Sequence, residues 1–333
     1  MVTILYTFDR RFMWKTFEAV DRHVTVTTAA LPLRPEAANY QSSIPELEAS
    51  IESAADLDAA VYEADPDVVV QNHRFEAAAL GERPAFHDEY PVVHLRHGAS
   101  VGRGEIDNTT RDLGDVVDLA LAPGERWAAR YREAFPESVD IAVVGIPEAD
   151  DLVGTDPPRE RCVLYAPTNH NYGGGCYLET AEVVLDTFAD TDYRLLFRPH
   201  PMDRIEEPGA SVTERCRERI ADLRNVVFDE ADTPRESMLA ADLLVSDYSG
   251  IVTEWLHTGR PLVQLTAVAS GSDVPELGYA TDELTLETMD RLYENGYPPT
   301  IERRVDEQLA ALGIPMDGHA GERAAREVVG CTQ

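Results

Sequence analysis

A polar turn at residues 247–250, Asp-Tyr-Ser-Gly, has the composition of a phosphate-binding site. It follows an apolar run that ends at Ser246, and it precedes a helical pattern that includes Glu254. The first N–H groups of a helix lack carbonyl partners, so a turn in this place presents donors to an anion. The alternative is an ordinary N-cap, in which Asp247 or Ser249 bonds the first turn of a core helix. The turn by itself leaves both interpretations open.

A histidine at the end of an apolar strand pattern could act as a base. Gly98 follows His97 there, and a glycine permits a sharp backbone turn that exposes the imidazole. Histidine can take a proton from a hydroxyl near neutral pH. The alternative is a histidine that is hydrogen-bonded within the turn.

A second histidine lies in the motif Arg198-Pro199-His200-Pro201. The prolines fix the backbone on both sides of His200, and Arg198 offers a planar, permanent positive charge that suits phosphate oxygens. A rigid corner without a catalytic role would need the prolines but not the arginine and histidine together. The motif therefore predicts a functional site.

Apolar runs typical of strands alternate with helical patterns along the whole chain. We expect strands at 2–8, 24–27, 67–72, 91–98, 116–122, 141–145, 162–168, 193–197, 226–228 and 261–265, and helices at 46–63, 125–135, 178–188, 212–223 and from 284 onward. This alternation predicts two parallel α/β sheets, each wrapped by helices. Ligands bind at the carboxyl ends of such strands, where His97, Thr168, His200 and the 247–249 turn are expected.

The chain length of 333 residues suits two domains. Residues 147–158 are rich in Asp, Gly and Pro, which is typical of a linker. We therefore expect an N-terminal domain over 1–150 and a C-terminal domain over 151–333 that ends in helices.

The charge balance is strongly acidic, with 61 Asp and Glu against 29 Lys and Arg, and Lys15 is the only lysine. Molar salt screens charges over about 3 Å, so such a surface suits a halophilic, archaeal cytoplasm; an ordinary acidic protein is the alternative. A nucleic-acid partner is disfavoured because no basic stripe is present. The small cluster of Arg10, Arg11 and Lys15 is expected to be a solvated helix face, with an anion-binding site as the alternative.

The sequence indicates neither a metal site nor a tightly bound cofactor. The four cysteines lack C-x-x-C spacing, and the Gly173–Gly175 run is not followed by the Gly-Lys-Ser or Gly-Lys-Thr of a P-loop. A requirement for a divalent metal stays open. No apolar run approaches about 18 residues, and no leader pattern precedes the first strand. We expect a cytoplasmic enzyme that could associate peripherally with the inner face of the membrane.

The motifs together resemble the CDP-glycerol glycerophosphotransferase family, the teichoic-acid primases and polymerases. They run in the expected order from about residue 91 to 265: His97-Gly98, Gly145-Ile146-Pro147 with Asp150, Tyr165-Ala166-Pro167-Thr168, Arg198-Pro199-His200-Pro201, Ala241 to Ser249, Glu254-Trp255 and Gly259-Arg260-Pro261.

This resemblance implies a GT-B architecture, in which two Rossmann-like domains face each other across a cleft. It also implies the transfer of glycerol phosphate, or a related polyol phosphate, from a CDP-activated donor to an acceptor hydroxyl, with release of CMP. The N-terminal domain would hold a glycan or lipid-linked acceptor, with His97 as the base and Gly98 and Arg103 nearby. The C-terminal domain would hold the donor through His200, Arg198, Thr168, Asp247, Tyr248, Ser249, Gly250, Ile251 and Glu254.

The chain departs from the family pattern in three places. Ala99-Ser100-Val101-Gly102 replaces the usual Thr-Pro and lysine, and Arg103 is the nearest cation. Asn169-His170 replaces Trp-Arg, and Gly250 replaces the second serine of Asp-Tyr-Ser-Ser. Gly250 keeps its backbone N–H, so we expect phosphate binding to be retained.

Two other functions fit the same motifs. One is a GT-B glycosyltransferase or 2-epimerase-like enzyme that uses a UDP-sugar. The other is a nucleotide-binding module that has lost its chemistry, which the presence of both His97 and His200 disfavours.

Overall fold

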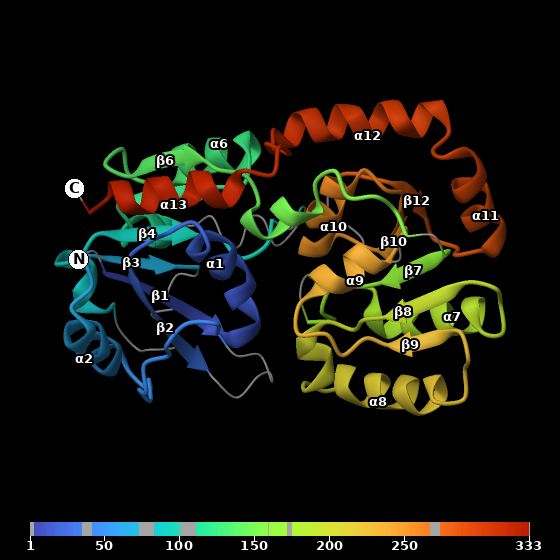
Figure 1. Cartoon of the computed structure of the whole chain (residues 1–333), viewed down its shortest axis with the longest axis horizontal. Coiled ribbons are helices and arrows are strands. Elements are labelled where there is room, and N and C mark those ends of the chain that lie inside the picture. The colour runs from blue at the N-terminus through green and yellow to red at the C-terminus, as the bar shows by residue number, and fades with distance from the viewer. Residues whose placement is uncertain are drawn as a thin grey trace. The chain divides into compact units, whose positions relative to one another are not determined.

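The computed structural model describes residues 3–34, 42–72, 83–99, 101, 111–158, 160–171, 175–266 and 274–332. The chain divides into two compact units, both drawn in Figure 1. Unit 1 comprises residues 1–98, 106–150 and 312–333, and unit 2 comprises residues 99–105 and 151–311. The chain changes unit at residue 150, but residues 312–333 group with unit 1 and not with the expected C-terminal domain.

Unit 1 is built on a six-stranded parallel sheet in the order β2-β1-β3-β4-β5-β6. Its strands are β1 (Thr3–Arg10), β2 (Thr27–Arg34), β3 (Val68–Gln71), β4 (Val92–Leu95), β5 (Leu119–Ala122) and β6 (Asp140–Val143). The helical segments of this unit are η1 (Arg11–Met13), α1 (Trp14–Asp21), α2 (Ala54–Ala64), η3 (Ala85–Asp88), α5 (Arg111–Gly114), α6 (Glu125–Ala134) and α13 (Ala320–Gly330).

The last helix of the chain completes the core of unit 1. Val328 of α13 packs in one apolar cluster with Phe17 of α1 and Val70 of β3. A Cβ on Gly321 would lie only 2.5 Å from the carbonyl oxygen of Ala19, so the two helices touch through their backbones. The return of residues 312–333 to unit 1 therefore follows from apolar burial, which no local pattern in the sequence reports.

Unit 2 has a second six-stranded parallel sheet, in the order β12-β11-β10-β7-β8-β9. Its strands are β7 (Cys162–Tyr165), β8 (Arg194–Phe197), β9 (Val226–Phe228), β10 (Leu243–Ser246), β11 (Leu262–Leu265) and β12 (Tyr279–Thr281). Its helices include α7 (Tyr177–Phe188), η5 (Pro201–Arg204), α8 (Gly209–Ile220), α9 (Pro234–Ala240), α10 (Gly250–Trp255), η6 (Leu256–Thr258) and α11 (Leu286–Asn295). Helix α12 (Pro299–Leu312) comes at the end of this unit, and η4 (Pro147–Leu152) spans the change of unit at residue 150.

The strand order of unit 2 reverses between β7 and β10. From β7 the chain builds the sheet outward through β8 and β9, and it then returns to place β10, β11 and β12 on the other side. Loops that leave two such neighbouring strands diverge onto opposite faces, which opens a crevice at their carboxyl ends. The segments after Tyr165 and Ser246 lie at this point.

Three of the differences between the expected and the observed elements have a clear physical reason. Helix α2 begins at Ala54 and not at residue 46, because Ser53 and Asp56 form a reciprocal capping box. Strand β2 covers Thr27–Arg34, beyond the expected 24–27, and it tolerates Pro32 because it is the outer strand of its sheet. Strand β12 was not predicted, since three residues carry too little periodicity.

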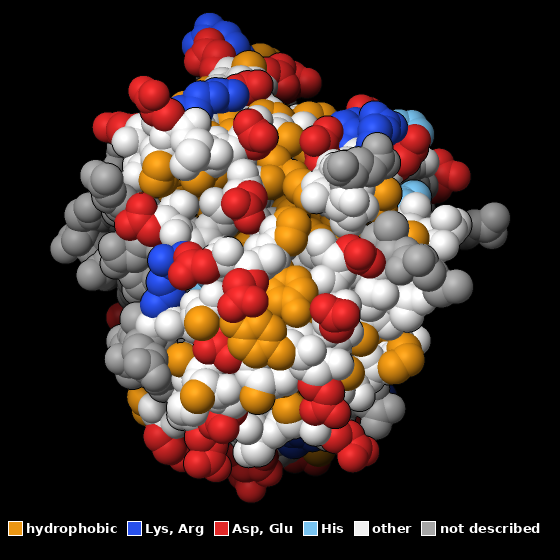
Figure 2. Space-filling model, turned by 90° about the vertical axis from the view of Figure 1, so that its left-hand side faces the viewer, with side chains coloured by type: hydrophobic (Ala, Val, Ile, Leu, Met, Phe, Trp, Pro, Cys, Tyr) orange, Lys and Arg blue, Asp and Glu red, His pale blue; other side chains and the backbone are white. Residues whose placement is uncertain are grey.

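The surface is rich in carboxylates. Figure 2 shows one face on which Asp and Glu side chains are spread among apolar ones, with few Lys or Arg side chains. Within the described part of the chain, no helix is long and apolar enough to span a bilayer. The same residues contain no cluster of three or more His, Cys, Asp or Glu side chains that could hold a metal ion.

Candidate active site

A buried carboxylate joins the two loops at the switch point of unit 2. Asp247 is 1% exposed, and its carboxylate accepts hydrogen bonds from the Thr168 hydroxyl at 2.6 Å and the Thr168 backbone N–H at 3.0 Å. It also accepts from the backbone N–H groups of Cys176 at 3.1 Å, Tyr248 at 2.7 Å and Ser249 at 3.1 Å. These bonds hold the segment after β7 against the segment after β10. Asp247 therefore fixes the conformation of the turn through its buried hydrogen bonds.

The start of α10 has no side-chain cap. Ser249 occupies the N-cap position, but its hydroxyl makes no capping bond. Asp247 bonds the N–H groups of Tyr248 and Ser249, which precede the helix. No described side chain bonds the N–H groups of Gly250 and Ile251, so the N-cap alternative is not what the structure shows.

The rest of α10 is anchored in the core of unit 2. Tyr248 is 1% exposed and Glu254 is 2% exposed. The indole N–H of Trp255 donates to the carbonyl oxygens of Arg260 and Pro261, both at 3.1 Å. A helix start held this firmly presents its N–H groups in a fixed direction.

His200 lies on the neighbouring loop, after β8. Its Nδ1 accepts a hydrogen bond from the Met202 N–H at 3.2 Å, and Pro201 opens the short helix η5. An imidazole that accepts at Nδ1 carries the proton of its neutral form on Nε2. His200 can therefore donate a hydrogen bond from Nε2.

Arg198 does not lie as the motif suggested. It is 6% exposed, and its guanidinium forms a buried ion pair with Asp229 at 2.9 Å. Asp229 also accepts from the Ser237 hydroxyl and from the Ala231 N–H. Arg198 thus fixes the loop that carries His200, and its charge is already paired.

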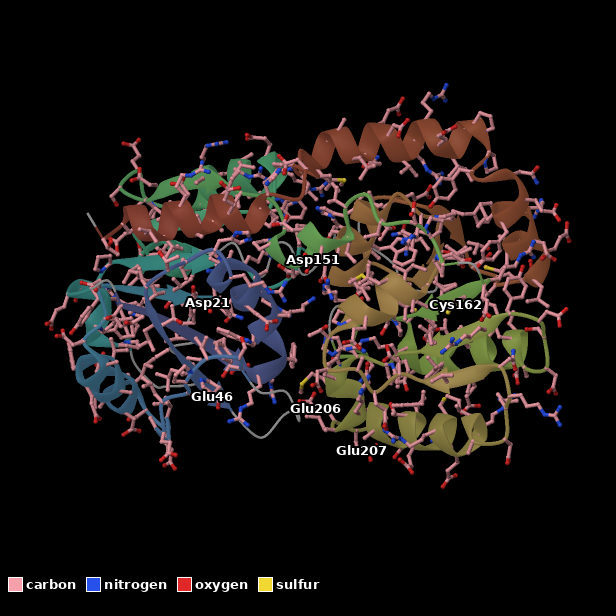
Figure 3. All side chains as sticks on the ribbon, viewed as in Figure 1. Asp21, Glu46, Asp151, Cys162, Glu206 and Glu207 are labelled. Atoms are coloured by element: carbon pink, nitrogen blue, oxygen red, sulfur yellow. The ribbon has the colours of Figure 1, made fainter. Side chains whose placement is uncertain are left out.

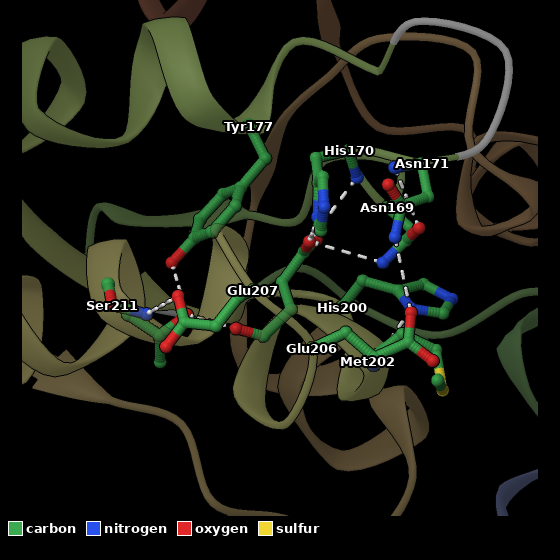
Figure 4. Close-up of polar contacts among 11 residues, drawn as sticks. Asn169, His170, Asn171, Tyr177, His200, Met202, Glu206, Glu207 and Ser211 are labelled. Carbon is green, nitrogen blue, oxygen red and sulfur yellow. Dashed lines mark hydrogen bonds and ion pairs between the residues drawn. The ribbon is translucent and has the colours of Figure 1, made fainter.

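His170 lies close to the His200 loop, as Figure 4 shows, and it is paired with a carboxylate. His170 Nδ1 forms a short contact with Asp203, and the two side chains are 4% and 0% exposed. Asn169 donates to the same carboxylate oxygen at 3.1 Å. Burial raises the pKa of Asp203, and the hydrogen bond from His170 opposes that rise. From the sequence, Asn169-His170 was only a departure from the family pattern.

This pair is closely packed against the start of α8. A Cβ on Gly209 would lie 2.5 Å from Asp203 Oδ1 and 2.8 Å from His170 Nδ1. Gly209→Ala is therefore expected to lower the free energy of unfolding by about 1–3 kcal/mol, measured by urea denaturation. Gly330→Ala is the matched control, since nothing lies within 4 Å of a Cβ there, and it should be neutral or slightly stabilising. Equal effects of the two substitutions would contradict the tight packing.

Two buried cysteines of unit 2 have raised thiol pKa values. Burial raises the pKa of the Cys176 thiol, and the Asp247 carboxylate raises it further. Burial also raises the pKa of Cys162, which lies at the start of β7 (Figure 3), to about 11. Both side chains remain thiols at neutral pH.

His97 lies in unit 1, just after β4. Gly98 has a φ of 66°, a left-handed conformation that a glycine adopts readily in a sharp turn such as the one expected after His97. The His97 Nδ1 lies 3.2 Å from the Thr16 hydroxyl oxygen, and the Phe12 ring packs edge-on with a centroid distance of 5.6 Å. The Thr16 hydroxyl donates to Glu148 at 2.8 Å. Neither Thr16 nor Glu148 was predicted from the sequence, because both are far from His97 along the chain.

Arg11 of the small basic cluster pairs with Glu46 at 2.6 Å, so part of that charge is neutralised. Arg103 lies outside the described residues, as do Gly173 and Gly174.

Two six-stranded parallel sheets, each wrapped by helices, with polar groups gathered at strand ends, define a protein of the GT-B fold class. The chain belongs to the CDP-glycerol:poly(glycerophosphate) glycerophosphotransferase family, whose sequence profile matches residues 64–267. No curated protein matches the chain in a sequence comparison.

Solved structures support the fold. The wall teichoic acid polymerase TagF matches with a TM-score of 0.63 and 15% identity, covering 98% of this chain and 88% of that chain. S. aureus MnaA, in a co-structure with UDP, matches with a TM-score of 0.64 and 16% identity, covering 98% and 96%. The UDP-GlcNAc 2-epimerase of Neisseria meningitidis, bound to UDP-GlcNAc, matches with a TM-score of 0.60 and 15% identity, covering 99% and 100%.

Proposed function

We propose that this protein transfers glycerol phosphate, or a related polyol phosphate, from a CDP-activated donor to an acceptor hydroxyl, with release of CMP. The observation that carries the proposal is the uncapped start of α10, held at the switch point of unit 2 by Asp247. This arrangement lies within the segment that matches the glycerophosphotransferase family. Two independent observations therefore support the proposal: backbone N–H groups that could bind an anion, and membership of the glycerophosphotransferase family.

The donor pyrophosphate would lie against the N–H groups of Gly250 and Ile251 and the hydroxyl of Ser249. Thr168, Tyr248 and Glu254 would shape this site together with Asp247, through the hydrogen bonds and packing described above. His200 would donate from Nε2 to a phosphate oxygen, where negative charge increases in the transition state. Arg198 would act on the donor indirectly, because its ion pair with Asp229 fixes the His200 loop.

His97 would serve as the base. The acceptor oxygen attacks the phosphorus that carries the glycerol, the bond from that phosphorus to the bridging oxygen of CMP breaks, and the acceptor proton passes to His97. Gly98 gives the histidine its position at the strand end, and Arg103 would belong to the acceptor side. We propose a glycan or lipid-linked acceptor, in the assembly of a cell-surface polymer at the inner face of the membrane, and no tightly bound cofactor.

The alternative is an enzyme that uses a UDP-sugar. It is favoured by one observation, the similarity in fold to MnaA with UDP and to the UDP-GlcNAc 2-epimerase. Direct titration of the purified chain, in molar KCl, with CDP-glycerol and with UDP-GlcNAc tests the two proposals. Tighter binding of CDP-glycerol is expected, and binding of UDP-GlcNAc alone would overturn the first proposal.

Ser249→Ala is expected to weaken the binding of CDP-glycerol about tenfold, because one hydroxyl donor to a charged phosphate is lost. The folded state should be unaffected, since the Ser249 hydroxyl makes no capping bond. Calorimetric titration measures the affinity, with Ser211→Ala, an exposed serine on α8, as the control. Unchanged donor affinity would argue against a phosphate site at this turn.

A further inference from the structure

His97 is connected to Thr16 and Glu148 by hydrogen-bonding contacts within unit 1. The His97 Nδ1 lies 3.2 Å from the Thr16 hydroxyl oxygen, and that hydroxyl lies 2.8 Å from a carboxylate oxygen of Glu148. Thr16 is 0% exposed and Glu148 is 8% exposed. The three residues are far apart in the sequence, separated by 81 positions between Thr16 and His97 and by 132 between Thr16 and Glu148.

The direction of these hydrogen bonds follows from which of the three side chains carry protons to donate. A threonine hydroxyl has one proton to donate, and an ionised carboxylate can only accept. The Thr16 proton is therefore directed to Glu148, and the Thr16 oxygen is left to accept from His97. The Nδ1 of a neutral His97 must then carry its proton, and the lone pair of the ring is on Nε2.

We propose that Thr16 and Glu148 are positioning residues that hold His97 in this tautomer. With the proton fixed on Nδ1, Nε2 is the atom that can accept a proton from a hydroxyl. When His97 becomes an imidazolium, the buried Glu148 charge stabilises it through the Thr16 hydroxyl. The tautomer follows from the geometry together with an ionised Glu148, whereas its catalytic use rests on the proposed function.

The parts of this chain of bonds are held by separate elements. Thr16 lies on α1, whose Phe17 and Val20 are in the core of unit 1. Glu148 lies in η4, two residues before Asp150, which accepts hydrogen bonds from the Ala320 and Gly321 N–H groups at the start of α13 at 2.9 and 2.7 Å. The backbone segment that carries Glu148 is thereby anchored independently of His97. Phe12 limits the rotation of the imidazole from another side.

The tautomer can be measured without any assay of activity. Nitrogen-15 NMR of the full chain labelled in histidine, with the His97 signals assigned by their loss in His97→Asn, distinguishes a protonated Nδ1 from a protonated Nε2. At a pH where the ring is neutral, the wild type is expected to carry its proton on Nδ1. A proton on Nε2 in the wild type would overturn the proposal, whatever the donor proves to be.

Kinetics test the functional part. Thr16→Val, which removes the hydroxyl at nearly constant volume, should lower kcat about ten- to one-hundredfold with little change in the KM for CDP-glycerol. Thr16→Ser should restore kcat to within a few fold, since it returns the hydroxyl. Thr7→Val is the matched control, because Thr7 is buried in the same unit and its hydroxyl has no partner among the described residues.

The outcomes separate the two proposals. A wild type that does not turn over CDP-glycerol contradicts the proposed function, and the NMR measurement still decides the tautomer. A Thr16→Val variant with wild-type kcat and an unchanged His97 tautomer would remove Thr16 from this role.

Discussion

His97→Ala should transfer glycerol phosphate about 10²- to 10⁴-fold more slowly than the wild type, the range typical of a lost general base. Donor affinity should stay nearly unchanged, because His97 belongs to unit 1 and the proposed phosphate site belongs to unit 2. Discontinuous assays of CMP release, sampled at several times, give kcat. Calorimetric titration with CDP-glycerol gives the donor affinity.

The control for this variant is His23→Ala, which removes an exposed histidine from the same unit. It should retain wild-type turnover, so that a loss in His97→Ala reports the base and not a general effect of removing a histidine. Wild-type turnover by His97→Ala would exclude His97 from the mechanism.

Asp247→Ala is expected to lose both stability and donor binding. Its carboxylate accepts from the Thr168 hydroxyl, from the Thr168 and Cys176 N–H groups, and from the N–H groups that lead into α10. Buried donors that lose their acceptor cost about 1–3 kcal/mol each, so the free energy of unfolding should fall by about 3 kcal/mol or more. The turn that would hold the donor phosphates should lose its fixed position at the same time.

Two further variants separate the charge of Asp247 from its geometry. Asp247→Asn keeps one acceptor oxygen and should lose less stability than Asp247→Ala. Asp186→Ala removes an exposed carboxylate from the same unit and should leave stability and donor affinity nearly unchanged. Urea unfolding and donor titration in molar KCl measure both quantities, and wild-type values for Asp247→Ala would contradict the role assigned to this residue.

Much of the fold could be predicted because its strands carry strong local patterns. The valine run at the centre of β3 is buried on both sides, and such runs are typical of parallel sheets. A sharp turn at Gly98 could also be expected, since a glycine at the end of a strand permits the left-handed conformation that is observed. The element boundaries were less predictable at Ser53, where a capping box and not the apolar pattern sets the start of a helix.

The site could be predicted only where its residues form local motifs. The turn at Asp247 and the His200 loop could be proposed as parts of a site because each is contiguous in the sequence. Thr16 and Glu148 were missed because they meet His97 only in the folded chain. The motif predicted a phosphate contact for Arg198, but its partner Asp229 lies 31 positions away, and no local signal links the two residues.

The nucleotide released during turnover tests the central claim most directly. The purified chain would be incubated in molar KCl with glycan and lipid-linked acceptors and either CDP-glycerol or UDP-GlcNAc, with His97→Ala as the inactive control. We predict that CMP is released from CDP-glycerol and that glycerol phosphate becomes covalently attached to an acceptor. Release of UDP from UDP-GlcNAc, or its conversion to the 2-epimer, without CMP release from CDP-glycerol, would contradict this account.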